Sequence, residues 1–285
     1  MPSHTDQDTG IGRRSRYRGR ASHMMMYEFC AQTDRGLARG NNEDSVSLDE
    51  SCGLAILADG MGGYNAGEVA SGMATALIQA EMGQWLNKAG PQATGRDIRQ
   101  ALELSVGNSN RAVFEASQAN PDYAGMGTTL VVGVFRGPKL VVGHIGDSRC
   151  YRLRGGTLLR STRDHSLLQE QLDAGLITPE QAAVSTHRNL VTRALGVEPK
   201  AELEINEYKV EADDIYLLCS DGLSDMVDDA VIASILLAQQ PLAQCAEALI
   251  KAANAGGGRD NISVLLAKAE GGIRKRSLVS WLLGG

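Results

Sequence analysis

Short apolar runs alternate with long periodic segments along this chain. Three runs of strand length, 54–58, 215–220 and 262–267, each adjoin a turn that carries aspartate and glycine. Two longer segments, 68–86 and 97–117, place apolar residues at helical spacing and predict helices. Two more helices are predicted over 231–238 and 242–253. This mixture of strands and helices indicates an α+β protein.

The middle of the chain predicts two β-hairpins. Segments 128–135 and 139–145 flank the turn Arg136-Gly137-Pro138, and segments 150–153 and 157–160 flank Arg154-Gly155-Gly156. Turns this short join antiparallel neighbours, whereas a parallel crossover needs a dozen residues or more. The sequence therefore predicts antiparallel sheets.

A polar excursion follows the hairpins. Ser166 with Gln169, and Thr178 with Gln181, fit the spacing of helix capping boxes, and Pro179 suits a first helical position. Two short helices separated by glycine are expected, and then an extended polar stretch. We interpret residues 166–192 as a surface flap.

The two ends differ from the rest. Residues 1–26 are polar, carry five arginines between Arg13 and Arg20, and are expected to be a disordered extension. One continuous domain is expected over 27–270. Residues 271–285 are basic and then apolar, so this tail is expected to pack on the domain or to be disordered, or else to dock on a partner or membrane surface.

Composition removes several classes of function. A net charge of −6 argues against a general nucleic-acid binder, and no run approaches the roughly 18 apolar residues of a membrane span. No secretory signal is evident, so a cytoplasmic location is expected. The five cysteines form no C-x-x-C pair, and none has arginine six residues later as cysteine-dependent phosphatases require. We expect free thiols.

The candidate chemistry lies in carboxylates at the ends of apolar runs. Aspartate is charged at neutral pH, so several carboxylates gathered in one place repel unless a cation lies among them. Oxygen ligands of this kind suit hard divalent metals. The aspartates concerned are Asp44, Asp59, Asp147, Asp221 and Asp260.

The order of these motifs resembles the metal-dependent protein phosphatases of the PP2C (PPM) family, in its bacterial serine/threonine type. The resemblance covers about residues 27–268. The matching pieces are Arg39-Gly40-Asn41-Asn42-Glu43-Asp44, Asp59-Gly60-Met61-Gly62-Gly63, Gly127-Thr128-Thr129, Gly146-Asp147-Ser148-Arg149, Asp164-His165-Ser166, residues 188–196, Ser220-Asp221-Gly222-Leu223 and Arg259-Asp260-Asn261-Ile262-Ser263.

The resemblance implies an αββα sandwich, in which two antiparallel sheets pack face to face between outer helices, with a small flap subdomain. It also implies a centre for two Mn²⁺ or Mg²⁺ ions, and a third, weaker position. The implied ligands are Asp59 as the bridge, the Gly60 carbonyl beside it, Asp221 and Asp260 opposite, Glu43 and Asp44 through water, and Asp147 with Asp221 at the third position. Asn261 would support these ligands.

The implied reaction is hydrolysis of phosphoserine and phosphothreonine on proteins, opposing a cognate kinase. We expect a metal-bridging hydroxide to attack phosphorus directly, with Asp59, Asp221 and Asp260 as catalytic residues. Arg39 is expected to grip the substrate phosphate. Met61 replaces a histidine that some animal relatives use as general acid, so another group must supply that proton. A monomer is expected.

Two alternatives stay open at this point. A non-catalytic binding module on the same fold would usually lack the metal-binding aspartates, but here they are present. A developmental phosphatase acting on regulators of sigma factors often carries a sensor domain, for which this chain has no room. Three histidines lie inside the expected domain: His144 and His165 are expected to be structural, and His187 falls in the flap.

Overall fold

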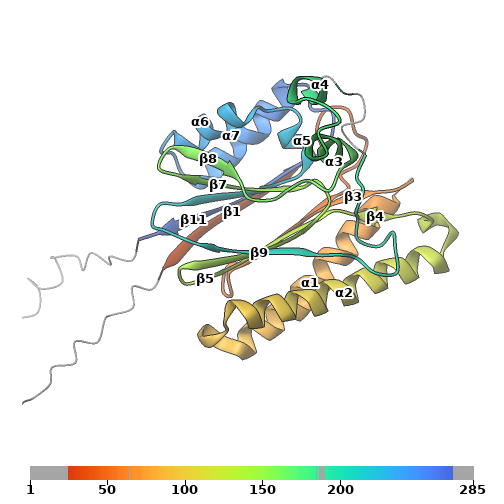
Figure 1. The fold of residues 1–285 in the computed structure, drawn as a ribbon. Coiled ribbons are helices and arrows are strands. Elements are labelled where there is room, and N and C mark those ends of the chain that lie inside the picture. The colour runs from red at the N-terminus through yellow and green to blue at the C-terminus, as the bar shows by residue number, and fades with distance from the viewer. Residues whose placement is uncertain (1–24, 64, 184, 186–189, 272–285) are drawn as a thin grey trace, which may run out of the picture.

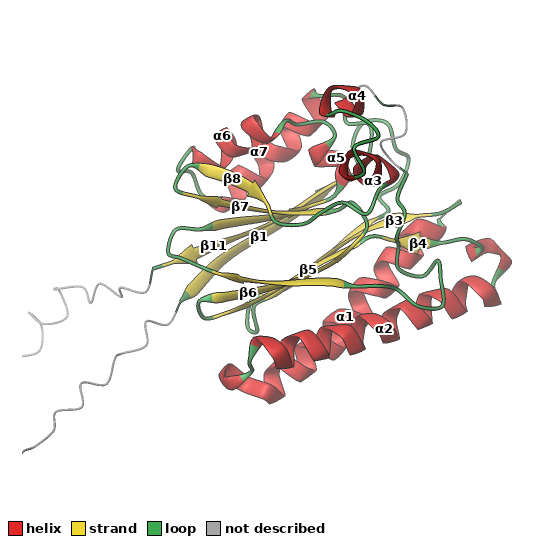
Figure 2. Cartoon of the chain, viewed as in Figure 1, coloured by secondary structure: helices red, strands yellow, loops and turns green. Residues whose placement is uncertain are grey.

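Two antiparallel β-sheets pack face to face, and helices cover both outer faces (Figures 1 and 2). The computed structural model describes residues 25–271, except 64, 184 and 186–189. The architecture confirms the α+β sandwich expected from the sequence. The predicted disordered extension, apart from its last two residues, and the tail beyond Gly271 lie outside the described residues.

The first sheet has five strands and joins the two ends of the domain. Its order is β1 (Met26–Asp34), β11 (Ile262–Glu270), β10 (Ile215–Cys219), β7 (Arg149–Arg154) and β8 (Thr157–Arg160). β1 and β11 pair along their whole length, from Met26 opposite Glu270 to Asp34 opposite Ile262. Met26, one residue before the predicted start of the domain, already belongs to this sheet.

The second sheet has six strands. Its order is β2 (Asp44–Asp49), β3 (Leu54–Met61), β5 (Leu130–Arg136), β6 (Lys139–Ile145) and β9 (Glu204–Lys209), and β4 (Gly127–Thr128) pairs with the end of β3. The chain passes between the two sheets several times, and one of these passages is the turn between β6 and β7. That turn carries Asp147, so the crossing point contributes directly to the candidate site.

Helices complete the four layers (Figure 2). α1 (Ala66–Ala89) and α2 (Gly95–Ala119), with short 3-10 turns η1 (Gly90–Gln92) and η2 (Pro121–Tyr123), cover the six-stranded sheet; α5 (Asp221–Ser224), α6 (Asp229–Leu237) and α7 (Leu242–Ala255) cover the other. Between the sheets lies a third apolar cluster that includes Leu57, Tyr216 and Leu265. Mostly aliphatic side chains fill these cores, as the low aromatic content predicts.

Both predicted hairpins are present. Arg136 pairs with Lys139, and Arg154 pairs with Thr157. In the second hairpin Gly155 and Gly156 both adopt positive φ, 55° and 84°. A two-residue turn of this kind matches the twist of the flanking strands, and glycine adopts it without steric cost.

The flap begins with the two predicted short helices, α3 (Leu167–Asp173) and α4 (Pro179–Ala183). The Thr178 capping box is reciprocal: Gln181 N–H donates to Thr178 Oγ1, and Thr178 N–H donates to Gln181 Oε1. At the first helix only half of the box forms, because Gln169 Oε1 accepts from Arg160 instead. His187 lies outside the described residues.

The strands that the sequence did not predict as separate elements are β1, β2, β4 and β9, and most residues of β1, β2 and β9 are only partly buried or exposed. The expected end of a strand just before Asp59 is wrong. β3 continues to Met61, because the short strand β4 pairs with Gly60 and Met61 and extends the ladder. None of the described helices combines the length and the apolarity that a membrane span needs.

Candidate metal centre

The fold gathers the five candidate aspartates at one end of the sandwich. Asp59 lies inside β3, directly opposite Asp44 at the start of β2. Asp221 follows β10, Asp260 precedes β11, and these two strands are neighbours in the other sheet. Asp147 lies on the turn that joins the two sheets. Residues that are distant in the sequence are thus brought together by strand pairing and by packing of the sheets.

Threonines of the motif at 127–129 hold the backbone of Asp59. Thr128 Oγ1 and the Thr129 N–H both donate to the Asp59 carbonyl, each at 2.8 Å. The Asp59 N–H donates to Thr129 Oγ1, which in turn shares a 2.7 Å hydrogen bond with Ser148 Oγ. Every backbone polar group of Asp59 therefore has a partner, and the carboxylate is left to the site.

Ser220 links the segments that carry Asp221 and Asp260 to Asp44 in the other sheet. Ser220 Oγ donates to Asp44 Oδ2 at 2.8 Å and accepts from Ser263 N–H at 2.9 Å. The approach of the two segments is so close that a Cβ on Gly222 would lie 1.9 Å from the carbonyl oxygen of Asn261. Only glycine fits there, which explains the Asp-Gly pair at 221–222 better than a turn does.

Gly60, like Gly222, permits a close approach of two backbone segments, here between β3 and α1. Its N–H donates to the Glu43 carbonyl at 3.1 Å. A Cβ at this position would lie 2.1 Å from the carbonyl oxygen of Gly67 in α1. The absence of a side chain lets the start of α1 pack against the strand that carries Asp59.

Mutual repulsion shows that the aspartates share one electrostatic environment. The pKa of Asp59 is raised well above its ordinary value, first by burial and then by the charges of Asp44, Asp221, Asp147 and Asp260. The pKa of Asp221 is raised in the same way, by burial and by its aspartate neighbours. Carboxylates so placed favour a bound cation, which offsets the repulsion.

Orphaned oxygens provide a direct test of whether a metal fits. Asp44 Oδ1 and Asp221 Oδ1 are both buried without a hydrogen-bond partner. A buried anionic oxygen left unpaired costs free energy, and oxygen is the ligand that Mg²⁺ and Mn²⁺ prefer. The residues present therefore fit a centre for hard divalent ions.

The carboxylates do not crowd into a single coordination sphere. Among the described residues, the one group of three or more His, Cys, Asp or Glu ligand atoms within 4.8 Å of one another is His144, His165 and Glu204, not the aspartates. Two ions that keep some of their waters would not need all of these carboxylates to meet within that distance.

Arg39, predicted to hold phosphate, lies at this site and forms an ion pair. Its Nη2 donates to Asp260 Oδ2 at 2.7 Å, and its side chain is 48% exposed. Asn261 bridges the neighbouring loops: its Oδ1 accepts from the Glu43 N–H, and its Nδ2 donates to the carbonyls of Arg35 and Asn41. Asn261 thus holds the loop of Glu43 beside the aspartates.

Sequence reasoning did not assign roles to Ser220, Thr128, Thr129 or Ser148. All four are buried polar residues inside or beside apolar strands. A buried hydroxyl needs a partner, so small polar residues at such positions were the available signal.

The aspartate charges predict an unusual pH dependence for the protein in a chelator. Burial raises the pKa of both Asp44 and Asp147 to about 6. The folded state then binds protons more tightly than the unfolded chain, whose aspartates titrate near ~4. This contribution to stability is present below pH ~4 and is lost as pH rises through about 6, at ~1.4 kcal/mol per pKa unit.

Thermal unfolding in EDTA at pH 5 and pH 7.5 measures this effect. Asp44→Asn should remove its share of the difference, about 1.4 kcal/mol, because pH 5 lies about one unit below the folded pKa of about 6. Exposed Asp122, replaced by asparagine, is the control and should leave the pH dependence unchanged. An Asp44→Asn variant with the same pH dependence as the unmodified protein would contradict the electrostatic account.

Comparisons with known proteins agree with this geometry. A family model described as protein phosphatase 2C matches residues 39–254. The serine/threonine protein phosphatase PstP of Mycobacterium tuberculosis is 43% identical over 244 residues, which are 85% of this chain and 45% of that protein. The serine/threonine phosphatase stp of Listeria monocytogenes is 38% identical over 242 residues, or 84% of this chain and 94% of that protein.

A solved structure is also similar. The crystal structure of the catalytic domain of PstP in complex with two manganese ions superposes with a TM-score of 0.76 at 40% sequence identity, and the match covers 86% of this chain and 99% of that one. The matched segment covers 45% of the full Mycobacterium relative, so this chain spans about half of its length.

Proposed function

This chain belongs to the protein phosphatase 2C family of serine/threonine phosphatases, and we propose that it hydrolyses phosphoserine and phosphothreonine on proteins with the help of Mn²⁺ or Mg²⁺. The observation that most directly supports this is a pair of buried carboxylate oxygens without hydrogen-bond partners, Asp44 Oδ1 and Asp221 Oδ1, near the buried Asp59. A set of carboxylates that repel one another at the end of a rigid sandwich suits metal-assisted hydrolysis of an anionic ester.

We assign the ligands as follows. Asp59 would bridge the two ions, because its backbone hydrogen-bonding groups are already satisfied and its carboxylate is left to the site. The remaining ligands would be the Gly60 carbonyl, Asp221 and Asp260, with Glu43 and Asp44 acting through water, and Asp147 with Asp221 would hold a third ion. When bound, the ions would supply a water-derived nucleophile near neutral pH and offset charge on the phosphoryl oxygens.

The residues of the chain then have distinct tasks. Ser220 and Asn261 hold the ligand loops in register by the hydrogen bonds described above. Arg39 is half-exposed at the rim, where its guanidinium can grip two phosphoryl oxygens once Asp260 binds metal. Met61 has no proton to donate, so the leaving alkoxide takes its proton from another group.

Assays with Mn²⁺ and a phosphothreonine peptide test this function. The full chain should hydrolyse the peptide only when metal is present, and EDTA should abolish turnover reversibly. Failure to hydrolyse both the peptide and p-nitrophenyl phosphate in saturating Mn²⁺ would instead favour a binding module. Phosphoproteomics of a deletion strain would identify the physiological substrates and test the proposed opposition to a cognate kinase.

Arg39→Ala tests the phosphate-binding role in the same assay. Hydrogen bonds to charged groups are worth about 1.5–3 kcal/mol, so KM for the phosphopeptide should rise roughly tenfold to a hundredfold with a smaller change in kcat. Arg96→Ala, an exposed arginine on α2, is the matched control and should leave KM unchanged. An unaltered KM in the Arg39 variant would remove this role.

A further inference from the structure

A second cluster of titratable side chains lies beside the metal centre. His144 in β6, His165 at the base of the flap and Glu204 at the start of β9 place ligand atoms within 4.8 Å of one another. Both histidines are almost fully buried, whereas the Glu204 side chain is 39% exposed. This is the arrangement that most resembles a metal site by residue type, so its hydrogen bonding decides what it does.

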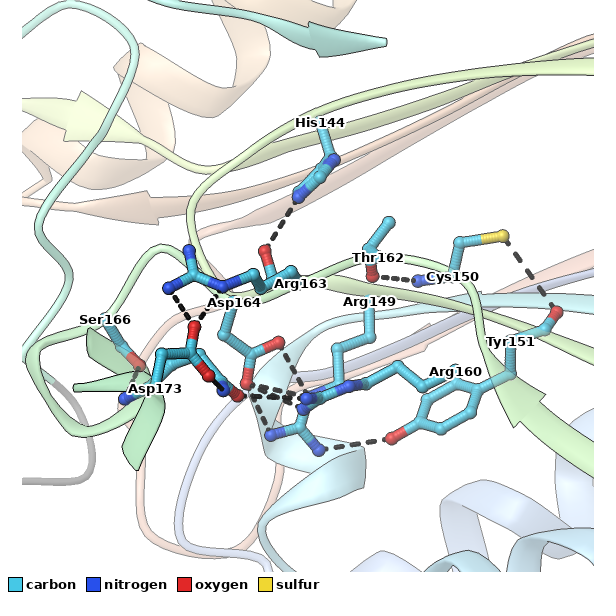
Figure 3. Close-up of polar contacts among 11 residues, drawn as sticks. His144, Arg149, Cys150, Tyr151, Arg160, Thr162, Arg163, Asp164, Ser166 and Asp173 are labelled. Atoms are coloured by element: carbon cyan, nitrogen blue, oxygen red, sulfur yellow. Dashed lines mark hydrogen bonds and ion pairs between the residues drawn. The ribbon is translucent and has the colours of Figure 1, made fainter. Parts of the chain in front are cut away.

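The proton positions on both rings follow from their partners. His144 Nε2 lies 2.8 Å from the carbonyl oxygen of Arg163, which can only accept, so Nε2 carries the proton (Figure 3). The Gly146 N–H donates to His165 Nδ1 at 3.2 Å, so that nitrogen is unprotonated. The proton of His165 is therefore on Nε2, 3.4 Å from Glu204 Oε2.

Ring geometry excludes shared metal binding in this arrangement. The two imidazoles are stacked, with centroids 4.7 Å apart and planes only 18° from parallel. A nitrogen lone pair lies in the plane of its ring, so lone pairs of parallel rings do not converge on one ion. Both nitrogens of His165 are also engaged already. The cluster therefore acts through hydrogen bonds.

His165 holds Gly146 from two sides. Its backbone N–H donates to the Gly146 carbonyl at 2.9 Å, and its Nδ1 accepts from the Gly146 N–H. Gly146 has φ +99°, in the region that favours glycine, and is followed directly by Asp147. The orientation of this turn, and so of the Asp147 carboxylate, depends on these two contacts.

The same residue ties the turn to the flap. The His165 carbonyl accepts from the Thr192 N–H at 2.8 Å, where the flap returns to the domain. The next residue, Ser166, caps α3 and forms an isolated bridge with Val191. Asp164, just before His165, is fixed by Arg149 and Arg160, as Figure 3 shows. The segments that enter and leave the flap, at Ser166 and at Val191–Thr192, therefore lie together beside His165.

We propose that His165 is a positioning residue that fixes the turn of Asp147 relative to the flap, and that Glu204 secures the ring tautomer that this requires. The proposal rests on the metal role proposed above for Asp147. It extends that role by giving the third metal position a defined support, coupled to the flap through Thr192 and Val191. Loss of such supporting partners typically lowers metal affinity about 10–100-fold.

Two substitutions of similar size distinguish the effect of the hydrogen bond between His165 Nδ1 and the Gly146 N–H from the effect of packing against His144. His165→Asn keeps an acceptor, because Oδ1 takes the place of Nδ1, whereas His165→Leu removes it; both lose the stacking on His144. Mn²⁺ titration of the full chain without substrate, followed by calorimetry or electron paramagnetic resonance, should show the weakest class of sites weakened about tenfold or more in the leucine variant. The asparagine variant should stay within about threefold of the unmodified protein.

Hydrogen exchange of the Gly146 amide gives a second readout that does not need metal. Exchange should accelerate in His165→Leu and stay protected in His165→Asn. Glu204→Gln keeps an acceptor for Nε2–H and should behave like the unmodified protein, as should Glu207→Gln on the same strand. If the leucine variant folds and both Gly146 exchange and Mn²⁺ binding are unchanged, or if asparagine fails to restore protection, the positioning role is wrong.

The two readouts also separate this proposal from the metal assignment. If Gly146 protection follows the substitutions but no weak Mn²⁺ class exists in the unmodified protein, the hydrogen-bonded clamp stands and the third metal position at Asp147 fails. ¹⁵N spectra of the imidazoles check the tautomer independently: a proton found on Nδ1 of His165 would overturn the proposal.

Discussion

Asp59→Asn is expected to abolish phosphatase activity and, at the same time, to stabilise the protein in EDTA. The two effects have one cause. Burial and then the charges of four other aspartates raise the pKa of Asp59, so its carboxylate destabilises the metal-free fold and favours cation binding. Asparagine keeps the shape, removes the charge and cannot bridge two ions as a carboxylate does.

The expected sizes differ greatly. A metal supplies several kcal/mol of transition-state stabilisation, and each ~1.4 kcal/mol is a factor of ten, so kcat/KM should fall by about a thousandfold or more. Stability in EDTA at pH 7.5 should rise by on the order of 1–3 kcal/mol, measured by urea unfolding. Saturating Mn²⁺ should stabilise the unmodified protein much more than the variant.

Asp122→Asn serves as the control because this exposed aspartate lies outside the cluster. It should change neither activity nor stability measurably. Asp221→Asn should repeat the Asp59 result, since burial and aspartate charges also raise its pKa. Retained activity of either variant in metal-replete buffer would count decisively against the proposed mechanism, and an unchanged stability in EDTA would contradict the repulsion argument.

The sequence located the aspartates because they stand at the ends of apolar runs, and three of the five, Asp59, Asp147 and Asp221, adjoin glycine. The steric reason for those glycines is visible only in three dimensions, as at Gly222, where a Cβ would collide with the carbonyl of Asn261. Strand length at Asp59 was also inaccessible, because it depends on a partner strand some seventy residues later in the chain. Local patterns report local periodicity, whereas pairing between distant segments does not alter them.

The hydrogen bonds that support the candidate ligands could not be predicted from the sequence either. Thr129 and Ser220 are ordinary small polar residues in the sequence, and their value comes from the oxygen or amide that the fold places 2.7–3.0 Å away. Asp164 is a similar case, since its motif marks it but no spacing rule predicts its partners. Those partners are Arg149 on β7 and Arg160 at the end of β8, and they make the residue a major structural element.

Asp164→Ala is therefore expected to destabilise the protein severely. Arg149 Nη2 lies 2.7 Å from Asp164 Oδ2 and its Nε contacts both carboxylate oxygens, while the Arg149 and Asp164 side chains are only 20% and 8% exposed. Removing one partner of a buried pair leaves an uncompensated charge and costs about 3–5 kcal/mol. Total stabilities are about 5–15 kcal/mol, so this is a large fraction.

Matched variants show whether the loss of stability comes from leaving Arg149 buried without its ion-pair partner. Glu207→Ala breaks an exposed pair with Lys139, whose side chains are 40% and 53% exposed, and should cost about 1 kcal/mol or less. The double variant Arg149→Met/Asp164→Leu removes both buried charges and should recover most of the stability lost in Asp164→Ala, because the desolvation cost disappears along with the attraction. Urea unfolding of the four proteins measures the differences. A double variant as unstable as Asp164→Ala would mean that the carboxylate matters for holding the flap base beside His165, not for neutralising Arg149.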